Sequence, residues 1–394
     1  MRRLVLKEED DRWMKADLFN QILAGSTSGL VCPNLCSLIF YFTRANQQFI
    51  PHFLSPYLTH FAIRVSPSSR NIPRDLLPDP IPILQALPTS CLQELSIDLG
   101  QNRMDLLRDE ISSVVRRCGH SLRVLSVPTP LGEAAVRHIV EFKNLRVWNT
   151  VCSPPPSTLP LSTTFPPLRS LILRKDAQGW IPWLAQRERD ISHAHSGSAN
   201  HVGLRATLIH LVFCGSVLVD AMFISPLSHF SNILVLSVQS HCAGPVGCVF
   251  SLTNQDVIQL SAALPRLGVL DLGHPCSNNT SHTTVPCLLA LSVHCKGLFR
   301  LKIHLNTTNL TSDIQSLSVD PDFRHLASLP TRCRLVSFDP GSLPFPPTAS
   351  GEDVITIAAG LIGIFPSLVE VRPYIDLGWT TLHSSIRQLQ GVPA

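Results

Sequence analysis

A short pattern of apolar residues, L-x-x-L-x-L, recurs along the chain. One copy lies in the segment LPRLGVLDLG, at Leu267, Leu270 and Leu272. An amphipathic helix would space its apolar residues three or four apart throughout, and a strand would alternate them strictly, whereas this segment begins with one period and ends with the other. Eleven copies begin at residues 35, 58, 92, 122, 145, 168, 208, 233, 267, 298 and 368, and a degenerate copy begins near Leu335. We therefore expect a repeat protein.

The mixed period fits a unit that joins a strand to a helix. The L-x-L part predicts a short strand whose alternate residues point into a core, and the segment between copies predicts a crossover helix. The motif resembles the leucine-rich repeat, and several steps of 23 residues lie within that repeat's usual length. The resemblance implies an α/β fold, a curved solenoid with parallel strands on its concave face and helices on its convex face. Regular repeats carry Asn three positions after the last leucine, and here only Asn306 does, so we expect irregular repeats.

Helical signals lie between the copies. A stripe of apolar residues precedes the copy at 122 and predicts a helix there: Leu106, Leu107, Ile111, Val114 and Val115. Thr253 with Asp256, and Ser350 with Asp353, resemble capping boxes that open apolar runs. Helix and strand are therefore expected to alternate.

One segment, GWIPWLAQRERD, combines tryptophans with charges. Aromatic pairs can anchor a partner, but Trp is more often packed into a core, so we expect Trp180 and Trp183 to be packed. The charges at 187–190 are expected to form a solvated helix face.

Composition narrows the class of protein. Hydrophobic residues make up 44% of the chain and charged residues 15%, which favours a large folded core. The net charge of +4 is mild and no block of like charges occurs, so we expect no nucleic-acid partner. The longest apolar run, 354–365, is too short to span a bilayer, and no signal peptide begins the chain. We expect an intracellular protein, cytoplasmic or nuclear, with no membrane partner and with reduced, mostly buried cysteines.

Candidate chemistry is sparse. The nearest match to a nucleophile elbow, Gly25 to Gly29, has Thr27 where the serine belongs, and neither a phosphate-binding loop nor a metalloprotease motif occurs. A run of His and Cys residues lacks the paired spacing of structural zinc sites: His241, Cys242, Cys248, His274, Cys276, His282, Cys287, His294 and Cys295. We expect no catalytic residues, no metal and no cofactor, with an enzyme whose site is unrecognised as a less favoured alternative.

A binding surface is the remaining candidate. In each copy the residues flanking the last apolar position are expected on the concave face of the strands, where repeat proteins commonly bind. This predicts a partner-binding set: Ser96, Asp98, Ser126, Arg174, Gln239, Asp271, Lys302 and His304. The alternative is that these side chains are merely solvated.

Longer segments carry a more specific resemblance, among them CPNLCSL, ALPTSCLQEL, FSLTNQDVIQLSAALPRLGVLDLG and GEDVITIAAGLIGIFPSL. They resemble the leucine-rich-repeat region of fungal F-box-like proteins. That resemblance implies a substrate-recognition subunit of a Skp1-cullin-F-box ubiquitin ligase, in which F-box helices bind the Skp1 adaptor and the repeats present a protein substrate. An F-box needs about forty residues, and only 31 precede Cys32. We therefore expect the resemblance to hold for the repeats and the F-box itself to be missing.

The organisation that follows has two parts. Residues 1–31 are expected to form an N-terminal capping helix or an F-box remnant, with Trp13, Leu18 and Ile22 as possible contacts to the Skp1 adaptor. Residues 32–394 are expected to form the leucine-rich-repeat domain. The alternative function is a stand-alone repeat scaffold without a role in ubiquitin ligation.

Overall fold

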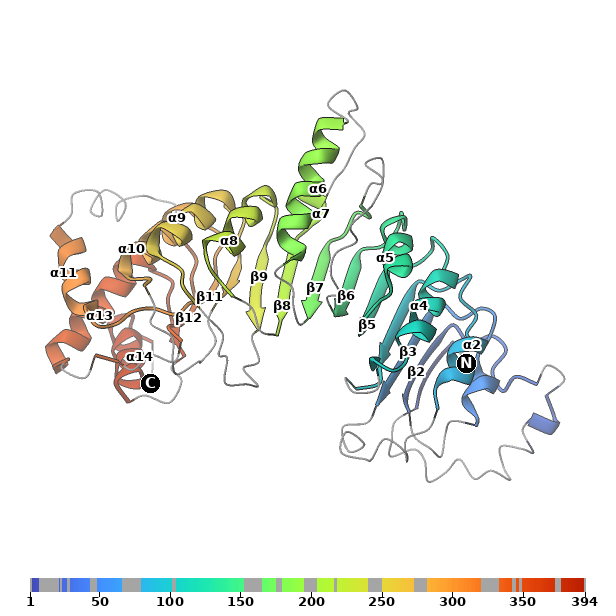
Figure 1. Cartoon of the computed structure of the whole chain (residues 1–394). Helices are drawn as coiled ribbons and strands as arrows, with labels where there is room; N and C mark the ends of the chain where they lie inside the picture. Colours follow the sequence, from blue (N-terminus) through green and yellow to red (C-terminus); the bar gives the residue numbers. More distant parts are fainter. Residues whose placement is uncertain are drawn as a thin grey trace. The chain divides into compact units, whose positions relative to one another are not determined.

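The chain forms two compact units in a computed structural model (Figure 1). Unit 1 comprises Met1–Arg174 and His193–Gly203, and unit 2 comprises Lys175–Ser192 and Leu204–Ala394. The structure describes residues 2–6, 21, 23–26, 29–42, 48–65, 79–100, 104–151, 165–174, 179–194, 204–215, 218–239, 250–272, 282–319, 333–341, 345–346, 349–372 and 377–392.

Unit 1 is built on parallel strands that pair in sequence order. They are β1 (Arg3–Leu6), β2 (Ser37–Phe42), β3 (His60–Val65), β4 (Glu94–Asp98), β5 (Val124–Pro130), β6 (Val147–Val151) and β7 (Ser170–Arg174). The register places one core residue of each repeat opposite the next, so that Leu95, Leu125 and Trp148 form a continuous buried row. The pairing of β5 with β6 shifts between Val127 and Pro130, since a proline cannot donate to the ladder.

Short helices join these strands. They are η2 (Ile50–Phe53), α2 (Ile81–Ala86), α4 (Arg108–Arg117) and α5 (Glu133–Val140). Helix α4 contacts both α2 and α5, so neighbouring crossovers stack side by side. The buried faces of the helices, such as Ile111, Val114 and Val115 in α4, complete the core.

Unit 2 repeats the arrangement with shorter strands. They are β8 (His210–Cys214), β9 (Val235–Gln239), β10 (Val269–Asp271), β11 (Arg300–Lys302), β12 (Ser337–Asp339) and β13 (Glu370–Val371), again parallel and in sequence order. Leu270, Leu301 and Phe338 continue a single buried row across the sheet.

Unit 2 contains both short helices and the longest ones of the described residues. They are α6 (Trp180–Ala194, whose last two residues fall in unit 1), α7 (Leu204–Thr207), α8 (Ala221–Ile224), η5 (Ser225–His229), α9 (Asn254–Ala263), α10 (Val285–His294), α11 (Leu310–Val319), α13 (Gly351–Ile364) and α14 (Leu377–Leu389). Both predicted capping boxes are confirmed, at Thr253 of α9 and Ser350 of α13, where each hydroxyl accepts from the backbone N–H of the Asp three residues later. In the part of the chain that the structure describes, no helix is both long and apolar enough to cross a membrane.

The predicted strand positions are confirmed in every copy of the pattern, including the degenerate one. Each strand begins two residues after the first apolar residue, as in β2 at Ser37 after Leu35 and β12 at Ser337 after Leu335. That first residue is buried at the turn, and the next apolar residue of the copy fills the core from the strand itself. The structure is thus an α/β fold with parallel strands, as the pattern indicated.

One element was not predicted, and two local predictions differ from the structure. The unpredicted element is the strand β1, in which exposed Val5 alternates with buried Leu6 at the edge of the sheet beside β2; residues 21, 23 and 24 are helical. Leu106 is 68% exposed because helix α4 begins at Arg108. Arg187 is buried in α6 rather than solvated, while Trp180 is packed in the core as expected. Trp13, Leu18 and Ile22 lie outside the described residues.

Candidate functional site

Each strand has one face toward the helices and one face away from them. In β4, Leu95 and Ile97 are buried in the core, whereas Glu94, Ser96 and Asp98 alternate with them and are half-buried or exposed. We call the second set, in every strand, the open face. The predicted residues of unit 1, namely Ser96, Asp98, Ser126 and Arg174, all belong to it.

The open face of unit 1 carries a hydrogen-bonded chain across three strands. Asn149 in β6 donates from Nδ2 to Ser126 Oγ at 2.9 Å, and its Oδ1 accepts from Arg174 Nε at 3.1 Å. An amide donates on one side and accepts on the other, so Asn149 suits this bridging position. Ser96 lies next in the register, opposite Ser126. Ser96, Ser126 and Asn149 form what we call the first polar row.

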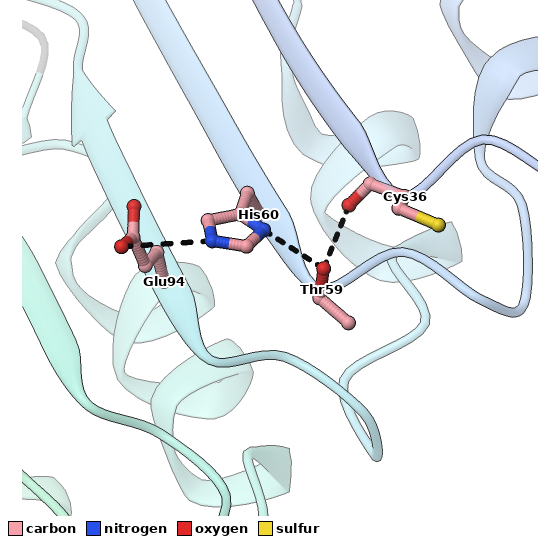
Figure 2. A network of polar contacts seen from close by, with 4 residues as sticks. All are labelled: Cys36, Thr59, His60 and Glu94. Atoms are coloured by element: carbon pink, nitrogen blue, oxygen red, sulfur yellow. Dashed lines mark hydrogen bonds and ion pairs between the residues drawn. The ribbon is translucent and has the colours of Figure 1, made fainter. Parts of the chain in front are cut away.

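A second polar network lies at the start of strands β3 and β4 (Figure 2). Thr59 Oγ1 donates to the carbonyl oxygen of Cys36 at 3.0 Å and lies 2.8 Å from His60 Nδ1, while His60 Nε2 lies 3.6 Å from Glu94 Oε1. Because the Thr59 hydroxyl proton is committed to Cys36, the hydrogen to Thr59 must come from His60 Nδ1. The network therefore links the residue before β2 to the first residues of β3 and β4.

The open face of unit 2 alternates charge from strand to strand. Asp271 in β10 lies between Ser237 in β9 and Lys302 in β11, and Lys302 lies beside Asp339 in β12. Ser237 Oγ donates to Asp271 Oδ2 at 3.5 Å, and Lys302 Nζ lies 3.7 Å from Asp339 Oδ2. We call Ser237, Asp271, Lys302 and Asp339 the second polar row. The register of four neighbouring strands fixes the positions of these charges relative to one another.

Asp271 is the most perturbed carboxylate of this row. Burial raises its pKa, and the nearby Asp339 raises it further, while Lys302, Arg300 and the hydrogen bond from Ser237 lower it. Its Oδ1 atom is buried and accepts no hydrogen bond. The two oxygens therefore differ: one is bonded to Ser237, and the other is a desolvated acceptor.

An exposed ion pair flanks the second polar row. Arg372 Nε lies 2.7 Å from Glu370 Oε1, and this contact lowers the pKa of Glu370 and raises that of Arg372. Glu370 stands opposite Ser337 in the register, two residues before the position of Asp339 in the row. The pair extends the charged surface to β13.

Of the two remaining predicted residues of unit 2, Gln239 lies on the open face and His304 does not. Gln239 is exposed at the end of β9, where its Oε1 accepts a weak hydrogen bond from the thiol of Cys214 at 3.8 Å. His304 is not on the open face: it is only 2% exposed, and its ring lies 6.1 Å from that of Phe250. Strand β11 ends at Lys302, so the alternation that placed His304 on the open face does not continue that far.

Asn149, Ser237 and Asp339 were not singled out from the sequence, although a signal for them exists. Ser237 lies between the last two apolar residues of its copy. Asn149 and Asp339 occupy the same position, four residues after the first apolar residue, in the copies at 145 and 335, which lack the last apolar residue. Ser96, Ser126, Asp271 and Lys302 occupy the same position. A rule applied to this one position in every copy would have found both polar rows.

The cysteines and histidines of the described ranges offer little chemistry. No group of three or more His, Cys, Asp or Glu side chains there is placed to hold a metal ion. Burial raises the pKa of Cys287 and Cys295 to about 12 and that of Cys333 to about 11, so these thiols stay protonated at neutral pH. Of the other members of the predicted run, His282 and His294 lie within the described residues, whereas five lie outside them: His241, Cys242, Cys248, His274 and Cys276.

The two polar rows thus present fixed hydrogen-bonding groups and charges of both signs on strands that hold them in register. Such a surface can recognise a partner without bringing a nucleophile and a base together. No model of a known protein family matches the chain, and no match was found among curated proteins.

Proposed function

We propose that this chain is a non-enzymatic protein-binding module, a leucine-rich-repeat solenoid that uses the open face of its strands to hold a partner protein. One observation carries the proposal: the same position of successive repeats supplies both polar rows. In unit 1 these side chains are hydrogen-bonded from Ser126 through Asn149 to Arg174. Repeat proteins bind through surfaces of this kind, built from one position of each repeat.

The energetics favour recognition over simple solvation. Asn149 and Lys302 are only partly exposed and are held by neighbouring strands, so less side-chain entropy is lost when a partner binds. The mixed charges of the second polar row give electrostatic specificity rather than general attraction to polyanions. A surface with these properties fits a folded protein or a peptide of defined sequence.

The resemblance to F-box-like proteins extends the proposal to substrate recognition in a Skp1-cullin-F-box ubiquitin ligase. A stand-alone scaffold is the second candidate, and the position of β1 favours it. Arg3–Leu6 pairs with β2 as part of the repeat sheet, so these four residues are not available to an F-box helix. The two candidates share the binding face and differ in whether the Skp1 adaptor binds as well.

Site-specific photocrosslinking in cells tests the binding face. A photoreactive phenylalanine analogue replaces Ile172, whose half-buried side chain is next to Asn149 on the open face, and in a control it replaces the exposed Arg116 of helix α4. We expect defined protein adducts from position 172 and none from position 116. Equal adducts from both positions, or none from position 172, would contradict the proposal.

Co-purification with the host's Skp1 adaptor separates the two candidates. Deleting residues 1–31 would remove β1 and uncover β2, so Trp13→Asp and Leu18→Asp are better variants for this test. Recovery of the adaptor with the wild-type chain and its loss in these variants would support the ligase role. Its absence from both would leave the stand-alone scaffold.

A further inference from the structure

A row of arginines runs across unit 1 at the position just before each strand. The backbone N–H of Arg123 donates to the carbonyl oxygen of Gln93 at 2.7 Å, that of Arg146 to Arg123 at 2.8 Å, and that of Arg169 to Arg146 at 2.7 Å. These bonds make the three arginines direct neighbours just before β5, β6 and β7, where adjacent chain segments lie about 4.8 Å apart. We call Arg123, Arg146 and Arg169 the arginine row.

The charges of this row are not neutralised within the described part of the chain. Arg123 and Arg169 are exposed, and neither forms an ion pair or a side-chain hydrogen bond there. Arg146 is half-buried, and its Nη1 donates to the carbonyl oxygen of Pro167 at 3.1 Å, which holds the guanidinium against the segment before β7 without neutralising its charge. Three like charges at neighbouring positions repel one another, so the row is less favourable alone than with an anion bound.

The fold does not require arginine at this position. In unit 2 the same backbone ladder runs from Gly268 through Phe299 and Val336 to Val369, with no charged residue. The strands of both units are nevertheless parallel and in register. The arginines therefore serve something other than the pairing of the strands.

We propose that the arginine row binds an acidic segment of a partner protein, in which carboxylates accept hydrogen bonds from the guanidinium groups. This inference rests on the protein-binding function proposed above and names the chemistry of the partner. The planar guanidinium pairs with a carboxylate through two parallel hydrogen bonds. Acidic side chains three or four residues apart on a helix are about 5–6 Å apart, close to the spacing of the strands.

The surroundings of the row favour a protein segment over a nucleic acid. On the β4 side the row ends at the neutral Gln93, which is followed by the exposed carboxylate of Glu94. Because this carboxylate limits the positive charge to three neighbouring positions, the row suits a short acidic segment better than a long phosphate backbone. Nucleic-acid surfaces also tend to carry a broad basic patch, whereas this chain has a net charge of only +4.

Fluorescence anisotropy with the full chain and a labelled glutamate-rich peptide tests the inference, with a glutamine-rich peptide as the uncharged control probe. We expect the double variant Arg123→Gln/Arg169→Gln to bind the acidic peptide about tenfold more weakly than the wild type. The matched variant Arg108→Gln/Arg116→Gln removes two exposed charges from helix α4 and should bind as the wild type does. Added salt should weaken wild-type binding, since exposed charges are screened.

Three results would overturn the inference. The first is equal binding of the acidic peptide by the wild type and by the Arg123→Gln/Arg169→Gln variant. The second is no preference of the wild type for the acidic peptide over the glutamine-rich peptide. The third is tighter binding of a single-stranded oligonucleotide that is lost in the same variant, which would assign the row to nucleic acid. Circular dichroism of each variant excludes misfolding as the cause. The photocrosslinking at position 172 uses none of these arginines, so it separates failure of this inference from failure of the proposed function.

Discussion

Replacing Asp271 with asparagine should stabilise the protein at neutral pH. Asp271 lies in the second polar row, with one oxygen bonded to Ser237 and the other buried without a hydrogen-bond partner. Asparagine has nearly the same shape, so the substitution removes the negative charge and leaves the packing of β10 unchanged. Lys302 keeps its ion pair with Asp339 in the variant.

The size of the effect follows from two opposing contributions. A buried acceptor without a partner costs about 1–3 kcal/mol, and more when the group is charged. Lys302 and Arg300 recover part of this cost by attracting the carboxylate, and yet its pKa is raised overall, so burial outweighs them. A neutral amide avoids most of the desolvation but leaves one polar atom unpaired. We therefore expect a net gain of about 1 kcal/mol in the free energy of unfolding near pH 7.

The gain should depend on pH in a defined direction. The pKa of Asp271 in the folded protein lies above its ordinary value of 3.8, so its contribution to stability is fully present below pH 3.8 and is lost as the pH rises through the raised pKa. Asparagine does not titrate. The advantage of Asp271→Asn should therefore be small near pH 4 and reach its full size above the raised pKa.

Urea unfolding followed by tryptophan fluorescence and circular dichroism measures this difference at several pH values. The control is Asp98→Asn, which changes an exposed open-face carboxylate of unit 1 and should leave the free energy of unfolding nearly unchanged. A loss of stability in Asp271→Asn at neutral pH would show that the attraction of Lys302 and Arg300 exceeds the cost of burial. A gain of equal size at every pH would show that the charge is not its origin.

Two further predictions concern packing and reactivity. Gly360→Ala in α13 should destabilise the protein by about 1–3 kcal/mol in thermal or urea unfolding, because the added Cβ would lie 2.2 Å from Ile314 Cγ2. Gly351→Ala, where the Cβ meets nothing within 4 Å, should not, and similar losses in both variants would refute the steric argument. Iodoacetamide at about pH 8, followed by mass spectrometry, should modify the exposed Cys91 quickly and Cys287 hardly at all in the folded protein, because burial raises the pKa of Cys287 to about 12. Rapid modification of Cys287 without unfolding would contradict its placement in the core.

The strands could be predicted from the sequence because each repeats one local pattern. Every copy of L-x-x-L-x-L contains a strand that begins at its third residue, and Thr253 and Ser350 begin helices as their capping boxes indicated. Strand β1 was missed because Arg3–Leu6 is too short to contain the pattern and is stabilised by pairing with β2. Four residues are too few for local propensity to distinguish a strand.

The candidate site was only partly predictable. Ser126 and Arg174 were assigned to the correct face, but Asn149, which joins them, was not recognised. His304 was assigned to the wrong environment because the end of β11 depends on how the chain turns toward its neighbours. Alternation along a strand predicts the face of a side chain only as far as the strand extends.

The sequence by itself determined the repeating unit, the position of nearly every strand and the face toward which most side chains point, because these depend on the order of apolar and polar residues within a few positions. Only the tertiary structure decided which side chains meet. Arg123 and Arg146 are separated by 23 positions in the chain and yet are joined by a backbone hydrogen bond. Asp271 likewise stands opposite Lys302 on the neighbouring strand. Such contacts depend on the register between repeats, which is set by the packing of the whole core and by intervening segments of unequal length.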